Sequence, residues 1–368
     1  MRSSSDLDWE LHGLPIGNVK KAHRILVIRT DRIGDVVLAT PLIRALRHTF
    51  PTAYIAAMAR PYARDLLLHN PHLDEILVDD PTSDHRDWKG FWNQVALLRH
   101  HRFDTALLLL PTQRLAWMLF FAGIQTRIGV GTILYEVLTF MKTVSRKKYI
   151  PLRHEADYCM DLGRVLGVTS DDLSTELFLT ESEKEDAQRQ IHAANRGNEI
   201  LIGIHPGNGQ SAPNWRVDRY VELTAAMIEH RNVRIVVTGS RQENAYVPYF
   251  DKLHSNRITN LIGQLSLRQL MGVIGQLHVL VSSSTGPMHI AAALKVPTVS
   301  MFCPLTACSP VLWGPKSNRA EILLAPESYC THRCPGDPHI CDFEDGITVN
   351  EVHEAILRSI NLLTNIQN

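Results

Sequence analysis

Short apolar runs alternate along the chain with longer stretches in which apolar residues recur at helical spacing. The runs have the length and the Val and Ile content of buried parallel strands. We expect strands at Arg24–Ile28, Ala53–Ala57, Glu75–Val78, Thr105–Leu110, Ile200–Ile204, Arg234–Thr238, Val279–Ser282 and Thr298–Met301. Helices are expected at Val36–Thr49, Phe91–His100, Asp157–Leu166, Val217–His230, Leu267–Gly275, Pro287–Leu294 and Asn350–Leu363. This alternation predicts an α/β fold whose parallel sheets are covered by helices on both faces.

The alternation occurs in two sets, one before about residue 175 and one after about residue 195. The stretch 170–190 between them is rich in Asp, Glu, Ser and Thr, and we expect an exposed linker there. The predicted organisation is a polar extension (1–22), two Rossmann-like domains facing each other across a cleft (23–175 and 176–349) and a C-terminal helix (350–368).

Composition narrows the classes of function. The chain has 368 residues, and its 38 Lys and Arg balance its 38 Asp and Glu, so no overall positive field exists to hold a nucleic acid. The first 22 residues lack the apolar core of a signal peptide, and the apolar stretches 105–111 and 115–124 are too short to span a bilayer. We therefore expect a cytoplasmic protein without a nucleic-acid partner, with which six cysteines are compatible.

The segment Arg29–Leu42 is the most informative part of the first half. It follows the first predicted strand, turns at Gly34 and enters a helical pattern, so Asp35 is predicted near a helix N-terminus at the carboxyl edge of a sheet. Open α/β sheets bind their ligands at that edge. Asp35 is therefore either a helix cap or a working carboxylate.

Three turns in the second half also follow predicted strands. The stretch 205–215 begins His-Pro-Gly and is rich in small residues, whose free amides can bind phosphate oxygens, although taken alone an ordinary strand-to-helix turn explains it better. The stretch 284–289, Ser-Thr-Gly-Pro-Met-His, suits a helix start that faces an anion, although plain helix capping explains it as well. In the turn 238–243, Glu243 is placed to accept hydrogen bonds from a ribose or a base. Together they favour a nucleotide pocket.

These pieces resemble glycosyltransferase family 9, the bacterial ADP-heptose:lipopolysaccharide heptosyltransferases, over roughly residues 24–357. The matching pieces are Arg32-Ile33-Gly34-Asp35 with Pro41, Arg127-Ile128-Gly129, His154-Glu155, His205-Pro206-Gly207, Trp215, Thr238-Gly239-Ser240, 284–292 and Pro297. The resemblance implies a GT-B fold with two Rossmann-like domains, and an inverting transferase that needs no metal or other cofactor.

The resemblance also implies a division of labour. The N-terminal domain would hold a lipopolysaccharide core or lipid-linked sugar acceptor, and Asp35 would be the catalytic base. The C-terminal domain would hold a nucleotide-sugar, ADP-heptose in the first instance. Donor-binding residues would be His205, Pro206, Gly207, Trp215, Arg216, Thr238, Gly239, Glu243, Ser284, Thr285, Gly286, Pro287 and His289, and acceptor-binding residues would be Arg32 and Gly34. By their position after the second predicted strand, Arg60 and Arg64 are also candidates to face an anionic acceptor, although plain surface charge is the simpler explanation.

Two departures from the family pattern leave the donor open. Family members often carry a Lys where this chain has Pro213, and Arg216 would have to replace its charge. The heptosyltransferases often have Asp where Ser284 stands, although a Ser variant also occurs in the family. A UDP-sugar transferase, an epimerase and a catalytically silent nucleotide-sugar-binding member therefore remain alternatives.

Two further clusters have alternative explanations. The basic segment 142–153 is either a solvated loop or a contact for a phosphorylated lipid acceptor and the anionic inner-membrane surface. Cys330, Cys334 and Cys341, with His332 and His339 among them, have spacing unlike a standard zinc finger, so a thiol loop or one disulfide is preferred to a zinc site.

Overall fold

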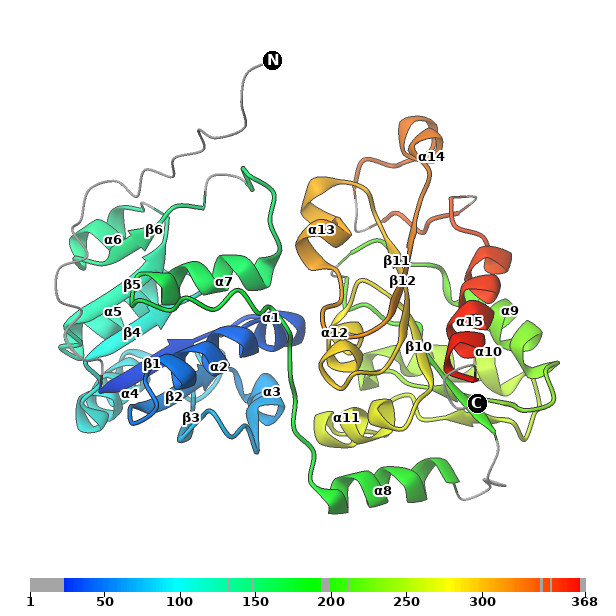
Figure 1. The fold of residues 1–368 in the computed structure, drawn as a ribbon, viewed down its shortest axis with the longest axis horizontal. Coiled ribbons are helices and arrows are strands. Elements are labelled where there is room, and N and C mark those ends of the chain that lie inside the picture. Colours follow the sequence, from blue (N-terminus) through cyan, green and yellow to red (C-terminus); the bar gives the residue numbers. More distant parts are fainter. Residues whose placement is uncertain are drawn as a thin grey trace.

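The computed structural model describes residues 23–131, 133–146, 149–192, 199–210, 212–337, 340–344 and 346–364. The predicted extension 1–22 lies outside these ranges. The described chain forms two α/β domains side by side, each with one six-stranded parallel sheet between layers of helices (Figure 1). The predicted α/β fold with two parallel sheets is confirmed.

The N-terminal sheet has the strand order β3-β2-β1-β4-β5-β6, with all neighbours parallel. Its strands are β1 (Arg24–Ile28), β2 (Tyr54–Ala59), β3 (Glu75–Val78), β4 (Thr105–Leu108), β5 (Thr126–Val130) and β6 (Lys142–Val144). Its helices are α1 (Ile33–Leu38), α2 (Thr40–Thr49), α3 (Pro61–Arg64), α4 (Trp88–His101), α5 (Gln113–Phe121), α6 (Leu134–Leu138) and α7 (Glu155–Arg164), with the 3-10 turn η1 (Asp65–Leu67).

The C-terminal sheet repeats this arrangement in the order β12-β11-β10-β7-β8-β9. Its strands are β7 (Ile200–His205), β8 (Val233–Val237), β9 (Ile258–Asn260), β10 (Val279–Ser283), β11 (Thr298–Phe302) and β12 (Ala320–Leu324). Its helices are α8 (Glu181–His192), α9 (Val217–Ile228), α10 (Val247–Asp251), α11 (Leu267–Gly275), α12 (Gly286–Ala293), α13 (Pro310–Trp313), α14 (Glu327–His332) and α15 (Val349–Thr364), with η2 (Arg241–Tyr246) and η3 (Thr306–Cys308).

The helix expected at Val36–Thr49 is divided at Ala39 into α1 and α2. Pro41 occupies the first turn of α2. Proline has no N–H group, but the N–H groups of the first turn have no partner within the helix, so no hydrogen bond of α2 is lost. The Thr40 hydroxyl donates to the carbonyl of Val37 at 2.8 Å and so closes the break. The division shortens the element that carries Asp35 and leaves α1 as a separate six-residue helix.

Part of the expected linker is helical. Residues 181–192 form α8, and Ala187 and Ile191 on one face of it are buried. An added methyl group on Gly272 of α11 would fall 3.0 Å from Ala187, so the two helices pack closely. The polar composition masked this short apolar stripe at i, i+4 spacing. The last helix, α15, packs on α9 in the C-terminal domain (Figure 1).

Candidate active site

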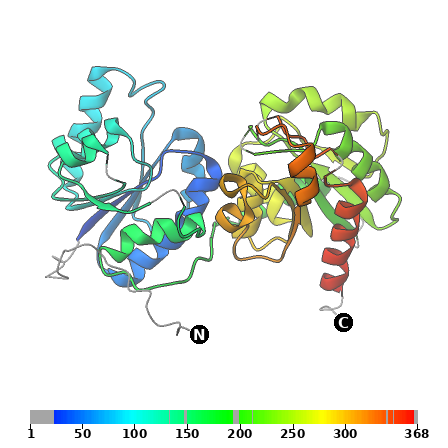
Figure 2. The same cartoon turned by 90° about the horizontal axis from the view of Figure 1, so that it is seen from above.

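The site lies where the two domains meet. Helix α1 follows β1, helix α12 follows β10, and the N-terminal turns of the two helices pack against each other between the sheets (Figure 2). The contact is close because it uses glycines: a methyl group added to Gly34 would fall 2.7 Å from Cδ2 of His289. A methyl group added to Gly286 would fall 3.0 Å from the Ile33 side chain. Glycine at these two positions lets the helix ends approach.

Asp35 sits in the first turn of α1 and is held by a buried arginine. Its carboxylate accepts from Nη2 of Arg29 at 2.5 Å, and only 14% of its side chain is exposed. The same guanidinium contacts Asp31 at 2.8 Å and Glu155 of α7 at 3.0 Å. Burial raises the pKa of Asp31 to about 6 against the lowering effect of Arg29, and the charge of Asp35 adds to the rise. Arg29 therefore fixes the carboxylate of Asp35 in one orientation.

The first turn of α12 meets the first turn of α1 from the other domain. Thr285 is its N-cap residue with extended backbone, its side chain makes no capping hydrogen bond, and Pro287 occupies the first turn. The amides of this turn and the helix dipole favour a bound anion. Ser284, Thr285 and Pro287 are buried, and Gly286 is half-buried.

His289 lies under that turn as a neutral side chain. Burial lowers the pKa of His289 to about 3, and His154 lowers it further by charge repulsion. Its Nδ1 atom is buried and makes no hydrogen bond within the described part of the chain. A buried ring nitrogen without a partner is unusual in a native fold, and it is what a polar ligand atom would satisfy.

The turn after β7 and the turn after β8 contact each other in the C-terminal domain. Nδ1 of His205 lies 2.9 Å from the Thr238 hydroxyl, and burial lowers the pKa of His205. Glu243 accepts from the Ser240 amide at 2.6 Å and lies over Gly207, where an added methyl group would fall 1.5 Å from its carboxylate. Glu243 therefore caps η2 and packs on the His-Pro-Gly turn.

Three of the predicted donor residues have other contacts. Trp215 is buried in the core, where Nε1 donates to the Ile347 carbonyl at 2.9 Å. Arg216 is exposed and pairs with Asp218 at 3.3 Å. The Pro206 carbonyl accepts from an Asn214 side chain at 2.7 Å. Pro213, where the family often has Lys, is buried. Gly239 follows Thr238 and lies close to Ile262 and Glu243.

The predicted acceptor residues surround the loop between β1 and α1. Arg32 is exposed at the N-cap position of α1. Arg60 donates to the Thr30 carbonyl at 3.0 Å, while Arg64 is exposed beside Asp65. Tyr62 was not selected from the sequence, because no motif marks it; its hydroxyl donates to the Asp31 carbonyl at 2.5 Å. The start of α3 is thus held against the loop before Asp35.

Two residues of the basic segment are neutralised by α7. Arg146 pairs with Glu155, and Arg153 pairs with Asp157 at 2.8 Å and Asp161 at 2.5 Å. Lys142 is exposed, whereas Lys147 and Lys148 lie outside the described residues. The segment is therefore not simply a solvated loop.

A direct hydrogen bond between the domains was not expected from the sequence. His154 caps α7 by accepting from the Ala156 amide at Nδ1 (3.2 Å), so the proton is on Nε2, which lies 2.9 Å from the Gly314 carbonyl. Burial lowers the pKa of His154 to about 4. The pair His154-Glu155 thus links Arg29 on one side to the C-terminal domain on the other.

All six cysteines are free thiols. Within the described ranges, no three His, Cys, Asp or Glu side chains are grouped to hold a metal ion, and no helix is long and apolar enough to cross a membrane. His339, named with the cysteines, lies outside those ranges.

Known proteins resemble the chain over most of its length. The model of glycosyltransferase family 9 (heptosyltransferase) matches residues 93–336. A lipopolysaccharide heptosyltransferase 2 of Escherichia coli is 27% identical, over 82% of this chain and 87% of its own. A protein of Haemophilus influenzae described as a putative glycosyltransferase is 24% identical, over 79% and 86% of the two chains.

Solved structures show the same fold. A family 9 glycosyl transferase of Veillonella parvula superposes with a TM-score of 0.78 at 22% identity, covering 92% of this chain and 97% of its own. The ADP-heptose heptosyltransferase II of E. coli gives 0.73 at 24% identity, covering 93% and 99%. The fold is therefore the two-domain GT-B fold expected from the resemblance. The chain is a glycosyltransferase and belongs to glycosyltransferase family 9, the heptosyltransferase family.

Proposed function

We propose that this enzyme transfers heptose from ADP-heptose to a sugar of the lipopolysaccharide core with inversion at the anomeric carbon. The observation that carries the proposal is the packing of α1 against α12, in which Ile33 and Gly34, the residues just before Asp35, lie against Gly286 and His289 at a helix N-terminus suited to a diphosphate. The names of the relatives support the substrates: several are lipopolysaccharide or lipooligosaccharide heptosyltransferases.

Asp35 is the proposed general base. As the acceptor hydroxyl forms its bond to the anomeric carbon, the bond from that carbon to the diphosphate breaks and the hydroxyl proton passes to the Asp35 carboxylate. Arg29 has no part in the proton transfer; its short contact to Asp35 holds the carboxylate in position. Inversion requires the base and the leaving group on opposite sides of the sugar, and the proposed sites for Asp35 and the diphosphate on two different domains are compatible with that.

The leaving diphosphate is the proposed ligand of the α12 turn. The amides after Thr285 and the helix dipole would oppose its charge without a metal ion. His289 would supply the unsatisfied Nδ1 atom, and His205 with Thr238 would line the nearer end of the nucleotide. Glu243 would contact the nucleoside, and the lack of a side chain at Gly207 leaves room for the Glu243 carboxylate.

The acceptor is proposed to enter along the N-terminal domain. Arg32 and Arg64 are exposed near the loop that carries Asp35 and can meet phosphate groups of a core saccharide. Because such an acceptor is attached to lipid, we place the enzyme at the cytoplasmic face of the inner membrane.

Two assays test this function. ADP should raise the midpoint of thermal unfolding by mass action, and a donor screen with mass-spectrometric detection should give product from ADP-heptose. Stabilisation by UDP or GDP alone would overturn the donor assignment. Absence of both stabilisation and product with every nucleotide-sugar would identify a silent member.

The role of Asp35 is tested separately by Asp35→Asn. We expect turnover to fall at least about a hundredfold, as for loss of a general base, with ADP affinity little changed. Asp74→Asn is a matched control, because Asp74 pairs with Arg47 at 2.6 Å on another part of the N-terminal domain. Unchanged turnover in Asp35→Asn would remove Asp35 from the mechanism.

A further inference from the structure

An aromatic belt lies on the helices of the N-terminal domain. Its rings form one chain of contacts with centroids 5.1–6.3 Å apart. The members come from α4, from α5 and from the turn just after α6, in the order Trp88, Trp92, Phe121, Trp117, Phe120 and Phe140. The belt thus holds three of the six tryptophans of the whole chain. Trp88 at one end is 72% exposed and Phe140 at the other end is 75% exposed.

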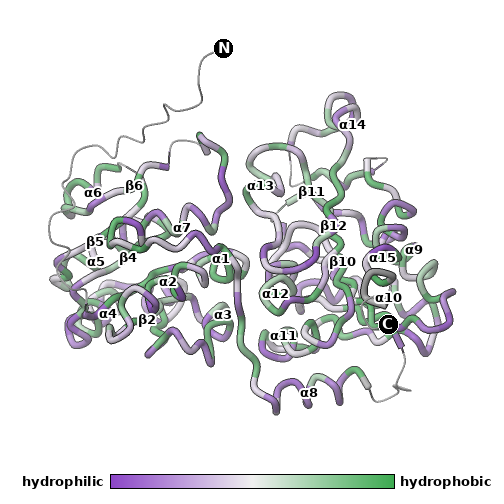
Figure 3. The backbone as a smooth tube through the Cα atoms, in the orientation of Figure 1, coloured by the Kyte–Doolittle hydropathy of each residue, from purple (hydrophilic) through white to green (hydrophobic). Residues whose placement is uncertain are grey.

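Helix α6 extends the apolar surface beyond Phe140. Leu134 is 72% exposed, Val137 and Leu138 are also exposed, and Glu136 is the buried residue of the helix. Figure 3 shows α6 at the outer end of the N-terminal domain, well away from the C-terminal domain. Half of the large exposed hydrophobic side chains among the described residues lie between 88 and 150. An apolar face concentrated in this way marks an interaction surface.

The same stretch is strongly basic in a chain whose overall charge is zero. Between residues 88 and 153 the sequence contains ten Lys and Arg but only two acidic residues, Asp104 and Glu136. Lys89 and Lys142 are exposed beside the two ends of the belt. The preceding loop is acidic, but its Asp87 caps α4 at 2.6 Å. Of the ten, Arg114 pairs with Asp79, Arg146 with Glu155, and Arg153 with Asp157 and Asp161. The exposed positive charges beside the rings include those of Lys89, Arg99 and Lys142.

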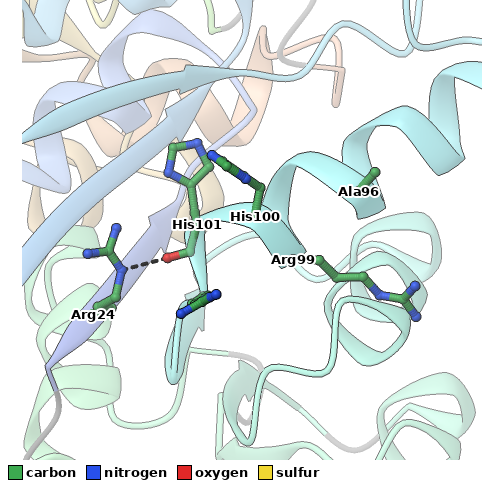
Figure 4. Close-up of a pocket in the computed structure, with 6 residues that line it drawn as sticks. Arg24, Ala96, Arg99, His100 and His101 are labelled. Carbon is green, nitrogen blue, oxygen red and sulfur yellow. Dashed lines mark hydrogen bonds between the residues drawn. The ribbon is translucent and has the colours of Figure 1, made fainter.

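A basic cavity of about 710 Å³ adjoins the belt at the end of α4. Figure 4 shows Arg24 of β1 and the α4 residues Arg99, His100 and His101 around it. Arg99 connects the cavity to the belt, since its Nε donates to the Phe121 carbonyl at 2.9 Å. Cationic side chains at a cavity next to exposed apolar rings suit a phosphate group that is attached to lipid.

We propose that the face formed by α4, α5 and α6 binds the surface of an anionic phospholipid bilayer. Tryptophan and other rings with an apolar body and a polar edge favour the membrane interface, and nearby Lys and Arg are attracted to anionic headgroups. A symmetric dimer through this face would instead bring the same positive charges together. Helices α4, α5 and α6 lie away from the C-terminal domain in both views (Figures 1 and 2). A bilayer bound to this face leaves the region between the two domains accessible to substrates.

Vesicle binding of the full chain tests this proposal without any transferase assay. We expect the protein to co-sediment with phosphatidylcholine vesicles that contain phosphatidylglycerol, and to bind pure phosphatidylcholine much less. Leu134→Ser with Phe140→Ser should weaken binding by roughly tenfold or more, because two exposed apolar side chains no longer enter the interface. Lys89→Glu with Lys142→Glu should weaken it by at least about fivefold per charge.

The matched control is Ile322→Ser with Leu324→Ser, which removes two exposed apolar side chains from β12 of the C-terminal domain. It should bind vesicles as the wild type does. All three double variants should retain wild-type turnover on a delipidated acceptor, so failure of the proposed reaction and failure of membrane binding are distinguishable.

Several results would overturn the proposal. One is a loss of vesicle binding in the β12 control as large as that in Leu134→Ser with Phe140→Ser. Another is vesicle binding that does not depend on phosphatidylglycerol, and a third is a dimer in light scattering that Leu134→Ser with Phe140→Ser dissociates. Tight binding of single-stranded RNA in place of vesicles would also overturn it. A blue shift of tryptophan fluorescence on vesicle addition, absent in Trp88→Phe, would support it.

Discussion

Replacing His154 should reduce the acid sensitivity of this enzyme. The neutral ring accepts from the Ala156 amide at Nδ1 and uses Nε2 toward the Gly314 carbonyl, so both nitrogens are occupied. Protonation of Nδ1 would break the cap of α7 and place a charge in a buried contact between the domains. Lys316 disfavours that charge and Asp157 favours it, but burial is the largest effect and lowers the pKa of His154 to about 4.

The direction of the pH dependence of stability follows from the linkage between proton binding and folding. The unfolded chain binds a proton near pH 6.5 and the folded chain only near pH 4, so the stability due to neutral His154 is complete above about pH 6.5 and is lost as the pH falls toward 4. At about pH 5 the loss amounts to about 2 kcal/mol of the free energy of unfolding. The other buried histidines add to the loss in the wild type but not to the difference between variants.

His154→Asn and His154→Gln form a matched pair for the assay. Asn keeps an acceptor for the Ala156 amide but loses the reach to Gly314, whereas Gln keeps a donor for Gly314 but loses the cap. At about pH 7.5 each should cost about 1 kcal/mol in urea unfolding. Between about pH 7.5 and pH 5 both should lose about 2 kcal/mol less than the wild type. Equal pH dependence in the wild type and both variants would refute the reasoning.

Three other substitutions test the site. Gly34→Ala should lower kcat at least about tenfold, because its methyl group would lie 2.7 Å from His289 and push the ends of α1 and α12 apart. Adding His289→Ala should bring the two domains together again in small-angle scattering, even if this double variant is inactive. Asp31→Asn should flatten the unfolding free energy between about pH 4 and 6, since the raised pKa of Asp31 makes the wild type less stable as the pH rises through about 6. Gly207→Ala should weaken ADP binding, measured by calorimetry, at least about tenfold, because the methyl group displaces Glu243. Unchanged affinity would show that Glu243 does not contact the nucleoside.

Much of the fold was predictable because local patterns decide it. The strands β1, β4, β7 and β10 are continuous apolar runs with both faces buried, and such runs have few alternatives to a parallel sheet. Four strands, β5, β6, β9 and β12, were not predicted. Of these, β6 and β9 have only three residues each and carry little apolar signal. Helix α8 was missed because only Ala187 and Ile191 mark its buried face in a polar stretch.

The candidate site was only partly predictable. The position of Asp35 after a strand and a glycine indicated a helix start at a sheet edge, and the structure places it there. Its partner Arg29 is near in sequence, but Glu155 is 126 residues from Arg29 and joins them only through the packing of α7. The contact of Gly34 with His289 spans the two domains, and no local pattern encodes it.

By itself the sequence determined two parallel α/β domains, strand–turn–helix junctions at the edges of their sheets and the residue types at those junctions. Burial periodicity and turn chemistry act over a few residues, so they can be read from the chain. Only the tertiary structure decided that α1 meets α12, that Arg29 gathers three carboxylates and that His154 bonds to the opposite domain. It also joined Trp88 and Phe140 into one basic, apolar face. These contacts depend on how whole layers pack, and that packing brings together residues far apart in sequence.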